Sequence, residues 1–259
     1  MRTSIVSRDF DISYRAEGEG APLLLLHGWS YCADTWWDAG YVDQLVGDHR
    51  VIAIDFLGHG DSDKPHDPAE YRDDLVVSDI VAVMDAEHID RALVWGYSMG
   101  AANAALLAVS EPSRVAVLVC GGEAPLPAPD GRREFLLSVA ESIRTAEGME
   151  AVLRAAGTPD ELVEESVAAN DLAALSAVMT VLSSDDRPVA ADVQAPSLWY
   201  QGSEDAPFSQ ANLEIATQFG VETHLIHGAN HVAGFWQTDD VLAVVRPFLG
   251  RHRSLAIAR

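Results

Sequence analysis

The sequence predicts an α/β protein with a mostly parallel, doubly wound sheet that helices cover on both faces. Short apolar runs, bounded by Gly, Pro or Asp, are spread through its 259 residues. They lie at 23–27, 51–55, 93–97, 115–119, 197–201 and 223–227. Runs this short and this apolar are typical of strands buried on both faces of a parallel sheet. Longer amphipathic stretches separate them, and strands that alternate with helices favour a parallel sheet between two helical layers.

The remaining elements follow from the same patterns. An antiparallel hairpin is expected at 3–10 and 11–17, before the first parallel strand. A helix is expected at 74–87, where apolar residues share one face. A second is expected at 98–110, which ends before a Glu-Pro pair, and a third at 238–249.

One segment interrupts this alternation. From about 132 to 184 the pattern is helical and contains no clear strand. We therefore predict two parts, an α/β core at 1–122 and 192–259 and a helical cap, or lid, at 123–191. An insertion of this kind usually covers the carboxyl ends of parallel strands, where ligands bind.

Charge and apolar content argue against some functions. Seventeen Lys and Arg against 40 Asp and Glu give a net charge of −23, so the chain should repel nucleic acids and anionic lipids. The longest apolar run, 21–26, is too short to cross a membrane, and the N-terminal segment holds no apolar stretch of signal-peptide length. We expect no nucleic-acid partner, no membrane association and a cytoplasmic location, with no signal for a particular oligomeric state.

The two cysteines carry no sign of a disulfide framework or a metal site. Cys32 and Cys120 are far apart, and neither has the spacing of a metal ligand. We expect both to be reduced and to have packing roles.

The strongest chemical signal is Gly96-Tyr97-Ser98-Met99-Gly100, a G-x-S-x-G pentapeptide. An apolar run comes directly before it and an alanine-rich helical pattern directly after it. Strand, sharp turn and helix is the context of a nucleophile elbow, in which glycines leave room for a strained turn. The helix N-terminus places free N–H groups beside the serine oxygen. Ser98 is therefore the predicted nucleophile, and the alternative is a plain N-cap serine.

A serine nucleophile needs a general base, and the chain offers nine histidines. His231 is the predicted base because it lies in the loop after the run at 223–227, from which a side chain can reach an elbow serine. His227, at the end of that run, is the runner-up, with loop bracing as its expected role. Four histidines in polar stretches are expected to be exposed: His49, His66, His88 and His252.

The base needs a carboxylate that orients its imidazole. Asp205 lies a few residues beyond a strand run, and Pro207 stiffens its loop. The chain order Ser98, Asp205, His231 is the order that accompanies a strand–elbow–helix nucleophile. Glu123, which also follows a predicted strand, is the alternative acid.

Two backbone N–H groups should stabilise the oxyanion of a tetrahedral intermediate. One is the N–H of Met99, directly after the nucleophile. The other is the N–H of Trp29, in the loop after the first parallel strand. Gly28 allows a tight turn there, and His27 is expected to brace the loop rather than to react.

Aromatic residues near these loops indicate a pocket. We expect Trp36, Trp37 and Phe235 to line it, together with Trp29 and Met99. Such a lining predicts an uncharged, largely apolar acyl group. The alternative is that at least one of Trp36 and Trp37 packs a helix against the sheet.

With these motifs, the chain resembles the α/β-hydrolase superfamily over most of its length. The matching segments are HGWS at 27–30, DFLGHGDSDKP at 55–65, GYSMG at 96–100, GSED at 202–205 and GANH at 228–231. Asp55, Gly58, Gly60 and Ser62 match the D-x-x-G-x-G-x-S segment of its esterase, lactonase, epoxide hydrolase and dehalogenase branch. The elbow serine departs from the dehalogenases and epoxide hydrolases, which carry aspartate there. The resemblance implies the α/β-hydrolase fold and an activity of the esterase or lactonase type.

We therefore predict a serine hydrolase that cleaves a carboxylic ester or lactone of a small, largely apolar molecule through an acyl-enzyme, without a metal or an organic cofactor. The same triad serves carbon–carbon bond hydrolases of the meta-cleavage type, cofactor-free perhydrolases and, more remotely, hydroxynitrile lyases. A different class is a ligand receptor that keeps this fold and turns over slowly. The turnover number distinguishes such a receptor from an esterase.

Overall fold

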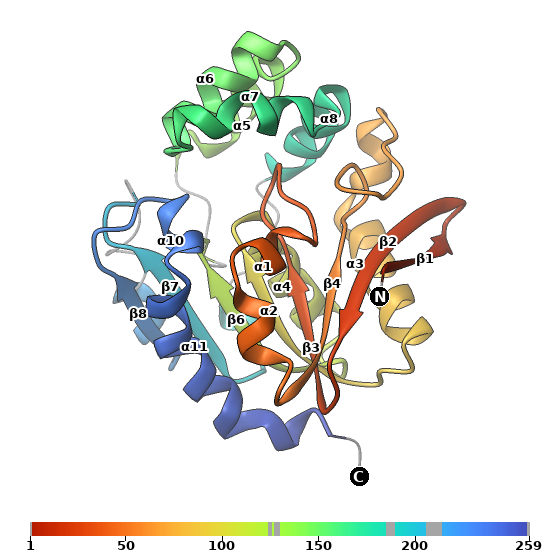
Figure 1. Ribbon diagram of the computed structural model, residues 1–259, viewed down its shortest axis with the longest axis vertical. Helices are drawn as coiled ribbons and strands as arrows, with labels where there is room; N and C mark the ends of the chain where they lie inside the picture. The colour runs from red at the N-terminus through yellow and green to blue at the C-terminus, as the bar shows by residue number, and fades with distance from the viewer. Residues whose placement is uncertain (1, 124–125, 127–129, 185–189, 206–213, 258–259) are drawn as a thin grey trace.

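The computed structural model describes residues 2–123, 126, 130–184, 190–205 and 214–257. Within them the strands form an eight-stranded sheet in the order β1-β2-β4-β3-β5-β6-β7-β8 (Figure 1). Pro207, which was expected to stiffen the loop of the predicted acid, lies outside the described residues.

The apolar runs of the sequence are the parallel strands. The bounds are β1 Arg2–Ser7, β2 Phe10–Glu17, β3 Ala21–Leu26, β4 His49–Ile54, β5 Ala92–Tyr97, β6 Val115–Gly121, β7 Ser197–Gly202 and β8 Glu222–Ile226. β1 and β2 form the predicted antiparallel hairpin, and β2 also pairs antiparallel with β4. The pairs from β4 through β3, β5, β6 and β7 to β8 are parallel. The prediction of a mostly parallel sheet is thereby confirmed.

Helices lie on both faces of this sheet. The bounds are α1 Thr35–Asp38, α2 Tyr41–Leu45, α3 Asp73–Ala86, α4 Met99–Ser110, α5 Arg132–Ser142, α6 Ala146–Ala156, α7 Asp160–Ala168, α8 Leu172–Leu182, α10 Ala233–Trp236 and α11 Thr238–His252. The predicted helices at 74–87, 98–110 and 238–249 correspond to α3, α4 and α11. The sequence did not predict α1, α2 and α10, because one turn of helix is too short for an apolar periodicity to show.

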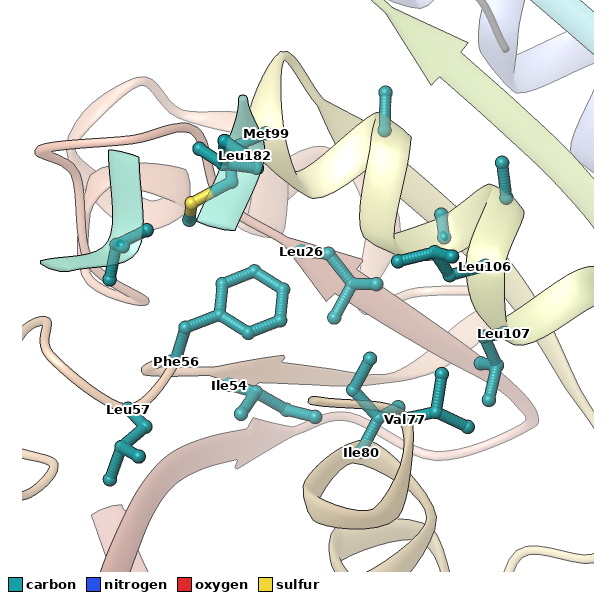
Figure 2. Close-up of a cluster of buried hydrophobic side chains, with 14 of the residues drawn as sticks. Leu26, Ile54, Phe56, Leu57, Val77, Ile80, Met99, Leu106, Leu107 and Leu182 are labelled. Atoms are coloured by element: carbon teal, nitrogen blue, oxygen red, sulfur yellow. The ribbon is translucent and has the colours of Figure 1, made fainter. Parts of the chain in front are cut away.

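The β3 strand shows why the runs are apolar throughout. Successive side chains of a strand point to opposite faces. Leu24 and Leu26 join the apolar cluster that faces α3 and α4, whereas Leu23 and Leu25 join the cluster that faces α2 and α11. Figure 2 shows part of the first cluster, with Leu26 and Ile54 from the sheet, Val77 and Ile80 from α3, and Leu106 and Leu107 from α4. Since both faces are covered, both sets of side chains must be apolar.

Helices α5, α6, α7 and α8 form a separate group at one edge of the sheet, above the strands in Figure 1. We call this group the helical layer. Thr145 caps α6 by accepting a hydrogen bond from the Gly148 N–H (3.1 Å), and Asp171 caps α8 by accepting from the N–H groups of Ala173 and Ala174. The layer lies within the predicted cap at 123–191, and the division of the chain into a core and a cap domain stays a prediction.

The helical layer also contains a bent pair of consecutive helices, α7 and α8. No single helix in the described ranges is long and apolar enough to span a membrane. Taken together, α7 and α8, which meet at 98°, have the length and the apolar composition of a membrane span.

Candidate active site

Ser98 lies at a strained turn between β5 and α4. Its backbone has φ of 52° and ψ of −118°, in the left-handed half of conformational space that residues with a Cβ avoid. The Ser98 N–H donates to the carbonyl oxygen of Gly121 on β6 (2.7 Å), which anchors the turn to the neighbouring strand. The strain therefore persists because the sheet and the helix on either side hold the turn in place.

The two flanking glycines allow this turn to pack. A Cβ at Gly96 would overlap the carbonyl oxygen of Gly100, and a Cβ at Gly100 would overlap the carbonyl oxygen of Leu26 on β3. Backbone atoms cannot move aside as a flexible side chain can. The two glycines of the G-x-S-x-G motif are thus required for the start of α4 to pack this closely against the sheet.

The structure brings the predicted triad together. The Ser98 Oγ lies 2.9 Å from Nε2 of His231, and Nδ1 of His231 lies 2.9 Å from Oδ2 of Asp205. A carboxylate only accepts hydrogen bonds, so Nδ1 carries the proton and Nε2 is free to accept from the serine hydroxyl. This is the arrangement in which a histidine can take the proton of a serine nucleophile.

Backbone hydrogen bonds hold the loops of the base and the acid against each other. The Glu204 N–H donates to the carbonyl oxygen of Ala229 (2.9 Å), which joins the two loops. The Asp205 N–H donates to that of Gly202 (3.2 Å), a bond within the loop of the acid. The Tyr97 hydroxyl donates to the carbonyl oxygen of His231 (2.6 Å). The residue before the nucleophile therefore fixes the backbone of the predicted base.

The alternative acid, Glu123, also lies at this site. It lines the same cavity as Ser98 and forms an ion pair with Arg132, whose Nη2 lies 3.7 Å from Oε1 of Glu123. The hydrogen bond from Nδ1 of His231 goes to Asp205. The geometry therefore favours Asp205 as the orienting acid and leaves Glu123 as a second negative charge in the site.

The electrostatics of the site raise the pKa of His231 above its usual value of 6.5. Desolvation lowers the pKa, but the hydrogen bond and the charge of Asp205, together with the charge of Glu123, outweigh it. A base with a raised pKa still needs to be neutral to accept a proton.

We therefore expect the activity to fall as the pH falls through a His231 pKa that lies above 6.5. The measurement is kcat/KM for a neutral ester against pH, which reports the free enzyme. Glu123→Gln should move the acid limb to lower pH, because it removes one of the charges that raise the pKa. An acid limb below pH 6.5 in the native protein, or one that Glu123→Gln leaves in place, would contradict this assignment.

The two predicted oxyanion donors face the same cavity. Met99 is the first residue of α4, so its N–H has no partner within the helix. Trp29 lies in the loop that follows β3, and both residues line the cavity beside Ser98. Among the described residues, no protein acceptor is found for either backbone N–H. The role of both groups in an oxyanion hole stays a prediction.

His27 is fully buried at the start of this loop. Its Nε2 accepts a hydrogen bond from the Phe56 N–H (3.1 Å), so its Nδ1 carries the proton and donates to the carbonyl oxygen of Gly28 (2.8 Å). Burial lowers the pKa of His27 to about 4, against a smaller opposing effect of the hydrogen bond to Gly28. A neutral imidazole held on both sides by backbone fits the expected role of a loop brace.

The exposure of the other histidines differs in part from the expectation. His66, His88 and His227 are exposed, whereas His252, which was expected to be exposed, is partly buried. His49 is only 3% exposed, which corrects the expectation of an exposed residue. It is the first residue of β4, where the sheet and its neighbouring loops cover it, although the surrounding sequence is polar.

The D-x-x-G-x-G-x-S segment forms a turn built around Asp55. The carboxylate accepts hydrogen bonds from the N–H groups of Ala33 (2.6 Å) and Asp61 (3.1 Å), and the Ser62 hydroxyl donates to the Asp55 carbonyl oxygen (2.6 Å). A Cβ at Gly60, which has φ of +52°, would overlap the carboxyl group. The segment therefore supports the structure of the turn and does not reach the triad.

A cavity of about 540 Å³ lies between Ser98 and His231 on one side and the helical layer on the other. Most of its wall is apolar: Trp29, Met99, Leu136, Val139, Met179 and Leu182 are among the residues that line it. Its two described groups with a full charge, Glu123 and Arg132, form the ion pair with each other. The wall therefore suits a neutral and largely apolar molecule.

Two of the predicted pocket residues, Trp29 and Met99, line this wall. The other three, Trp36, Trp37 and Phe235, do not, and that part of the prediction is corrected. Trp36 and Phe235 are 0% exposed and contact each other in the core, with ring centroids 5.0 Å apart. Trp37 is half-buried beside the core, and its indole N–H donates to Glu17 (2.9 Å) while the Arg15 guanidinium stacks on its ring. The alternative expectation, that Trp36 packs a helix against the sheet, describes what is found.

Sequence reasoning missed the aromatic pair that takes this place. Trp236 lines the cavity, and its indole N–H donates to the Tyr31 hydroxyl (3.3 Å), which also lines it. Trp236 follows Phe235 in α10, and adjacent residues on a helix point in directions about 100° apart. The sequence indicates an aromatic residue here, but a single helical turn carries no periodicity to show which neighbour faces inward.

The cysteines have no chemical role that the described residues support. Cys120 is buried and Cys32 is partly buried, and both are free thiols. Burial raises the pKa of both thiols. Among the described residues, no group of three or more His, Cys, Asp or Glu side chains is placed to hold a metal ion.

The helical layer meets the loop of His231 at Gly157, the C-cap of α6. Gly157 has φ of +96°, and a Cβ there would overlap the side-chain amide of Asn230, the neighbour of His231. The Asn230 side chain is held in turn, because its Oδ1 accepts a hydrogen bond from the Ala233 N–H (2.8 Å) in the same loop. Gly157→Ala should therefore disturb this loop and lower kcat/KM for a neutral ester by about tenfold or more, since small misplacements of a catalytic group are costly.

Gly131→Ala is the matched control for this change. Gly131 has φ of +80° at the start of α5, and a Cβ there would meet nothing within 4 Å. Both variants carry the same kind of backbone strain, and only one has the clash. Equal losses of activity would show that strain, rather than contact with Asn230, is responsible.

Comparisons with known proteins agree with this architecture. The family model of the α/β hydrolase fold matches residues 21–145. A 2-hydroxymuconate semialdehyde hydrolase of Pseudomonas sp. (strain CF600) is 36% identical over 126 residues, which are 48% of this chain and 44% of that protein. A putative 2-succinyl-6-hydroxy-2,4-cyclohexadiene-1-carboxylate synthase of Bacillus subtilis (strain 168) is 30% identical over 142 residues, which are 53% and 51% of the two chains. The aligned part thus spans about half the length of these relatives.

A solved structure extends the likeness to the whole chain. The enol-lactonase from Burkholderia xenovorans LB400 superposes with a TM-score of 0.83 over 96% of this chain and 100% of its own, at 22% sequence identity. At this identity the likeness concerns the fold. The family-model match over residues 21–145 and this superposition together show that the chain has the α/β-hydrolase fold.

Proposed function

We propose that this chain is a serine hydrolase that cleaves a carboxylic ester or lactone of a small, largely apolar molecule. The observation that carries the proposal is the continuous hydrogen-bonded chain from Ser98 through His231 to Asp205, with both distances at 2.9 Å, at the wall of an apolar cavity. No step in this chemistry needs a cofactor.

In the proposed mechanism, the Ser98 Oγ attacks the carbonyl carbon while Nε2 of His231 takes the hydroxyl proton. The backbone N–H groups of Met99 and Trp29 stabilise the oxyanion. His231 then gives its proton to the leaving alcohol, and an acyl-enzyme forms. A water molecule that His231 activates attacks this acyl group and releases the acid. Asp205 holds the imidazole in the required tautomer and stabilises its charged form.

The cavity wall supports the substrate class. Apolar side chains from the helical layer face the nucleophile, and the charges of Glu123 and Arg132 compensate each other. We propose that the segment 123–191 acts as a cap that covers a neutral acyl group. A dianionic acyl group would lack an unpaired cation among the described residues of the wall.

A carbon–carbon bond hydrolase is the second candidate. The relative that is 36% identical over 126 residues is a 2-hydroxymuconate semialdehyde hydrolase, although the match covers only 44% of that protein. The same triad could serve this reaction. The substrate distinguishes the two candidates, because a carbon–carbon hydrolase of this kind would act on 2-hydroxymuconate semialdehyde rather than on simple esters.

The test combines a covalent probe with a substrate panel. A fluorophosphonate should add one adduct to the intact mass of the native protein and none to Ser98→Ala. The panel contains neutral esters, lactones, matched esters with dianionic acyl groups and 2-hydroxymuconate semialdehyde. We expect the highest kcat/KM on a neutral ester or lactone. Preference for the semialdehyde would favour the second candidate, and tight binding without turnover would favour a receptor.

A further inference from the structure

The turn between α7 and α8 is hydrogen-bonded to the core at two points. The Asn170 side-chain amide donates to the carbonyl oxygen of Ser30 (3.2 Å), in the loop after β3. The next residue, Asp171, lies 3.1 Å from Nε2 of His66, which also belongs to the core. Two consecutive residues of the layer thus hold two separate segments of the core.

The loop that receives these contacts carries a proposed oxyanion donor. Ser30 directly follows Trp29, and its φ of 65° is unusual for a residue with a Cβ. The Trp29 indole N–H donates to the carbonyl oxygen of Leu175 on α8 (3.3 Å). The layer therefore contacts both the donor residue and the strained residue that follows it.

The other side of the same loop is held from within the core. The carbonyl oxygen of Gly28 accepts from Nδ1 of His27 (2.8 Å) and from the Tyr31 N–H (3.1 Å). The Trp29 peptide N–H thus lies between two anchored points, Gly28 on the core side and Ser30 on the side of the layer. Without the hydrogen bond from Asn170, Ser30 loses one of the contacts that hold its strained backbone conformation.

The chemistry of the Asn170 side chain suits a connection of this kind. A carboxamide carries two N–H donors on one nitrogen. Besides Ser30, the Asn170 amide donates to the carbonyl oxygen of Ser166 (2.8 Å), one of the last carbonyls of α7, which have no partner within the helix. One side chain therefore closes the end of a helix and holds the oxyanion loop. Aspartate has nearly the same shape and no donor.

We infer that Asn170 is a positioning residue for the reaction: it holds the loop 28–30 so that the Trp29 N–H points at the oxyanion. This inference rests on the proposed function, because it assigns a role within the same site. Asn170 does not line the cavity, so it acts through the loop and not on the substrate. The effect should then appear in the transition state, where the oxyanion forms, more than in substrate binding.

The test compares Asn170→Asp and Asn170→Ala with Thr145→Ala. The control variant removes the N-cap of α6, a hydrogen bond within the same layer that does not touch the core. Removal of one oxyanion donor costs about 10²–10³ in kcat, so a misplaced donor should cost about tenfold or more. We expect this loss in kcat for both Asn170 variants, with KM changed by less than about threefold. Thr145→Ala should keep kcat within about threefold of the native protein.

Two further measurements separate positioning from general destabilisation. Phenylboronic acid forms a tetrahedral adduct with a serine nucleophile, so its inhibition constant should rise by the factor by which kcat/KM falls. Amide hydrogen exchange of a peptide that covers 28–31 should become faster in the Asn170 variants and not in Thr145→Ala. A loss confined to KM, equal kcat losses in all three variants, or unchanged exchange at 28–31 would each overturn the inference.

The exchange measurement also distinguishes a failure of this inference from a failure of the proposed function. If the native protein neither hydrolyses esters nor binds phenylboronic acid, the proposed function fails. Faster exchange at 28–31 in Asn170→Asp would still support a loop held by Asn170, and unchanged exchange would overturn that role as well.

Discussion

Ser98→Ala should reduce ester turnover by several orders of magnitude and leave the fold intact. The hydroxyl is the proposed nucleophile, and members of a triad act as a unit, so the remaining groups cannot compensate for its loss. The backbone strain at position 98 does not change, because serine and alanine both carry a Cβ at the same φ of 52°. The measurements are kcat for a neutral ester and the Tm of both proteins.

Ser138→Ala is a suitable control for Ser98→Ala. Ser138 is an exposed residue of α5 whose hydroxyl donates to the Phe135 carbonyl oxygen (2.7 Å), away from the triad. It should keep native kcat. If Ser98→Ala retains more than about a tenth of native activity, the activation barrier has risen by less than about 1.4 kcal/mol, and Ser98 is not the nucleophile.

Asp205→Asn should lower kcat by about 10⁴-fold, whereas Glu123→Gln should lower it by less than about tenfold. The asparagine amide can donate to Nδ1 of His231, which moves the ring proton to Nε2 and removes the acceptor for the Ser98 hydroxyl. Glu123 acts on His231 through its charge, and the hydrogen bond of Nδ1 goes to Asp205. The measurement is kcat for a neutral ester, with the pH profile recorded for each variant.

The ranking of these two variants decides between the two acids. If each variant has the same Tm as the native protein, neither loss of activity comes from unfolding. A larger effect at Glu123 would assign the orienting role to the end of β6, and Asp205 would then be a loop residue. Similar losses at both positions would indicate that the two carboxylates share the stabilisation of the charged imidazole.

The sequence predicted the sheet and the elbow because both depend on local rules. A strand buried on both faces has to be apolar along most of its length, so β3 to β7 appear as short apolar runs. The elbow needs glycine at positions 96 and 100, where a Cβ would overlap backbone atoms, and this requirement is visible as a motif. Ser98, Asp205 and His231 follow the carboxyl ends of three strands, and in a parallel sheet these ends lie at one edge. Chain order and strand ends are therefore sufficient to nominate all three residues.

The cavity wall could not be predicted in the same way, because it depends on how separate segments pack. Trp36 and Phe235 are large aromatic residues of the kind that often line pockets. In the structure they are buried against each other, and Trp236 faces the cavity instead. The contact between Asn170 and Ser30 joins residues 140 positions apart in the chain. No local pattern marks such a pair, since its formation depends on the angle at which α7 and α8 lie over the sheet. Residues whose roles follow from local backbone and burial rules can be predicted from the sequence. Residues that meet between the helical layer and the core can be identified only from the tertiary structure.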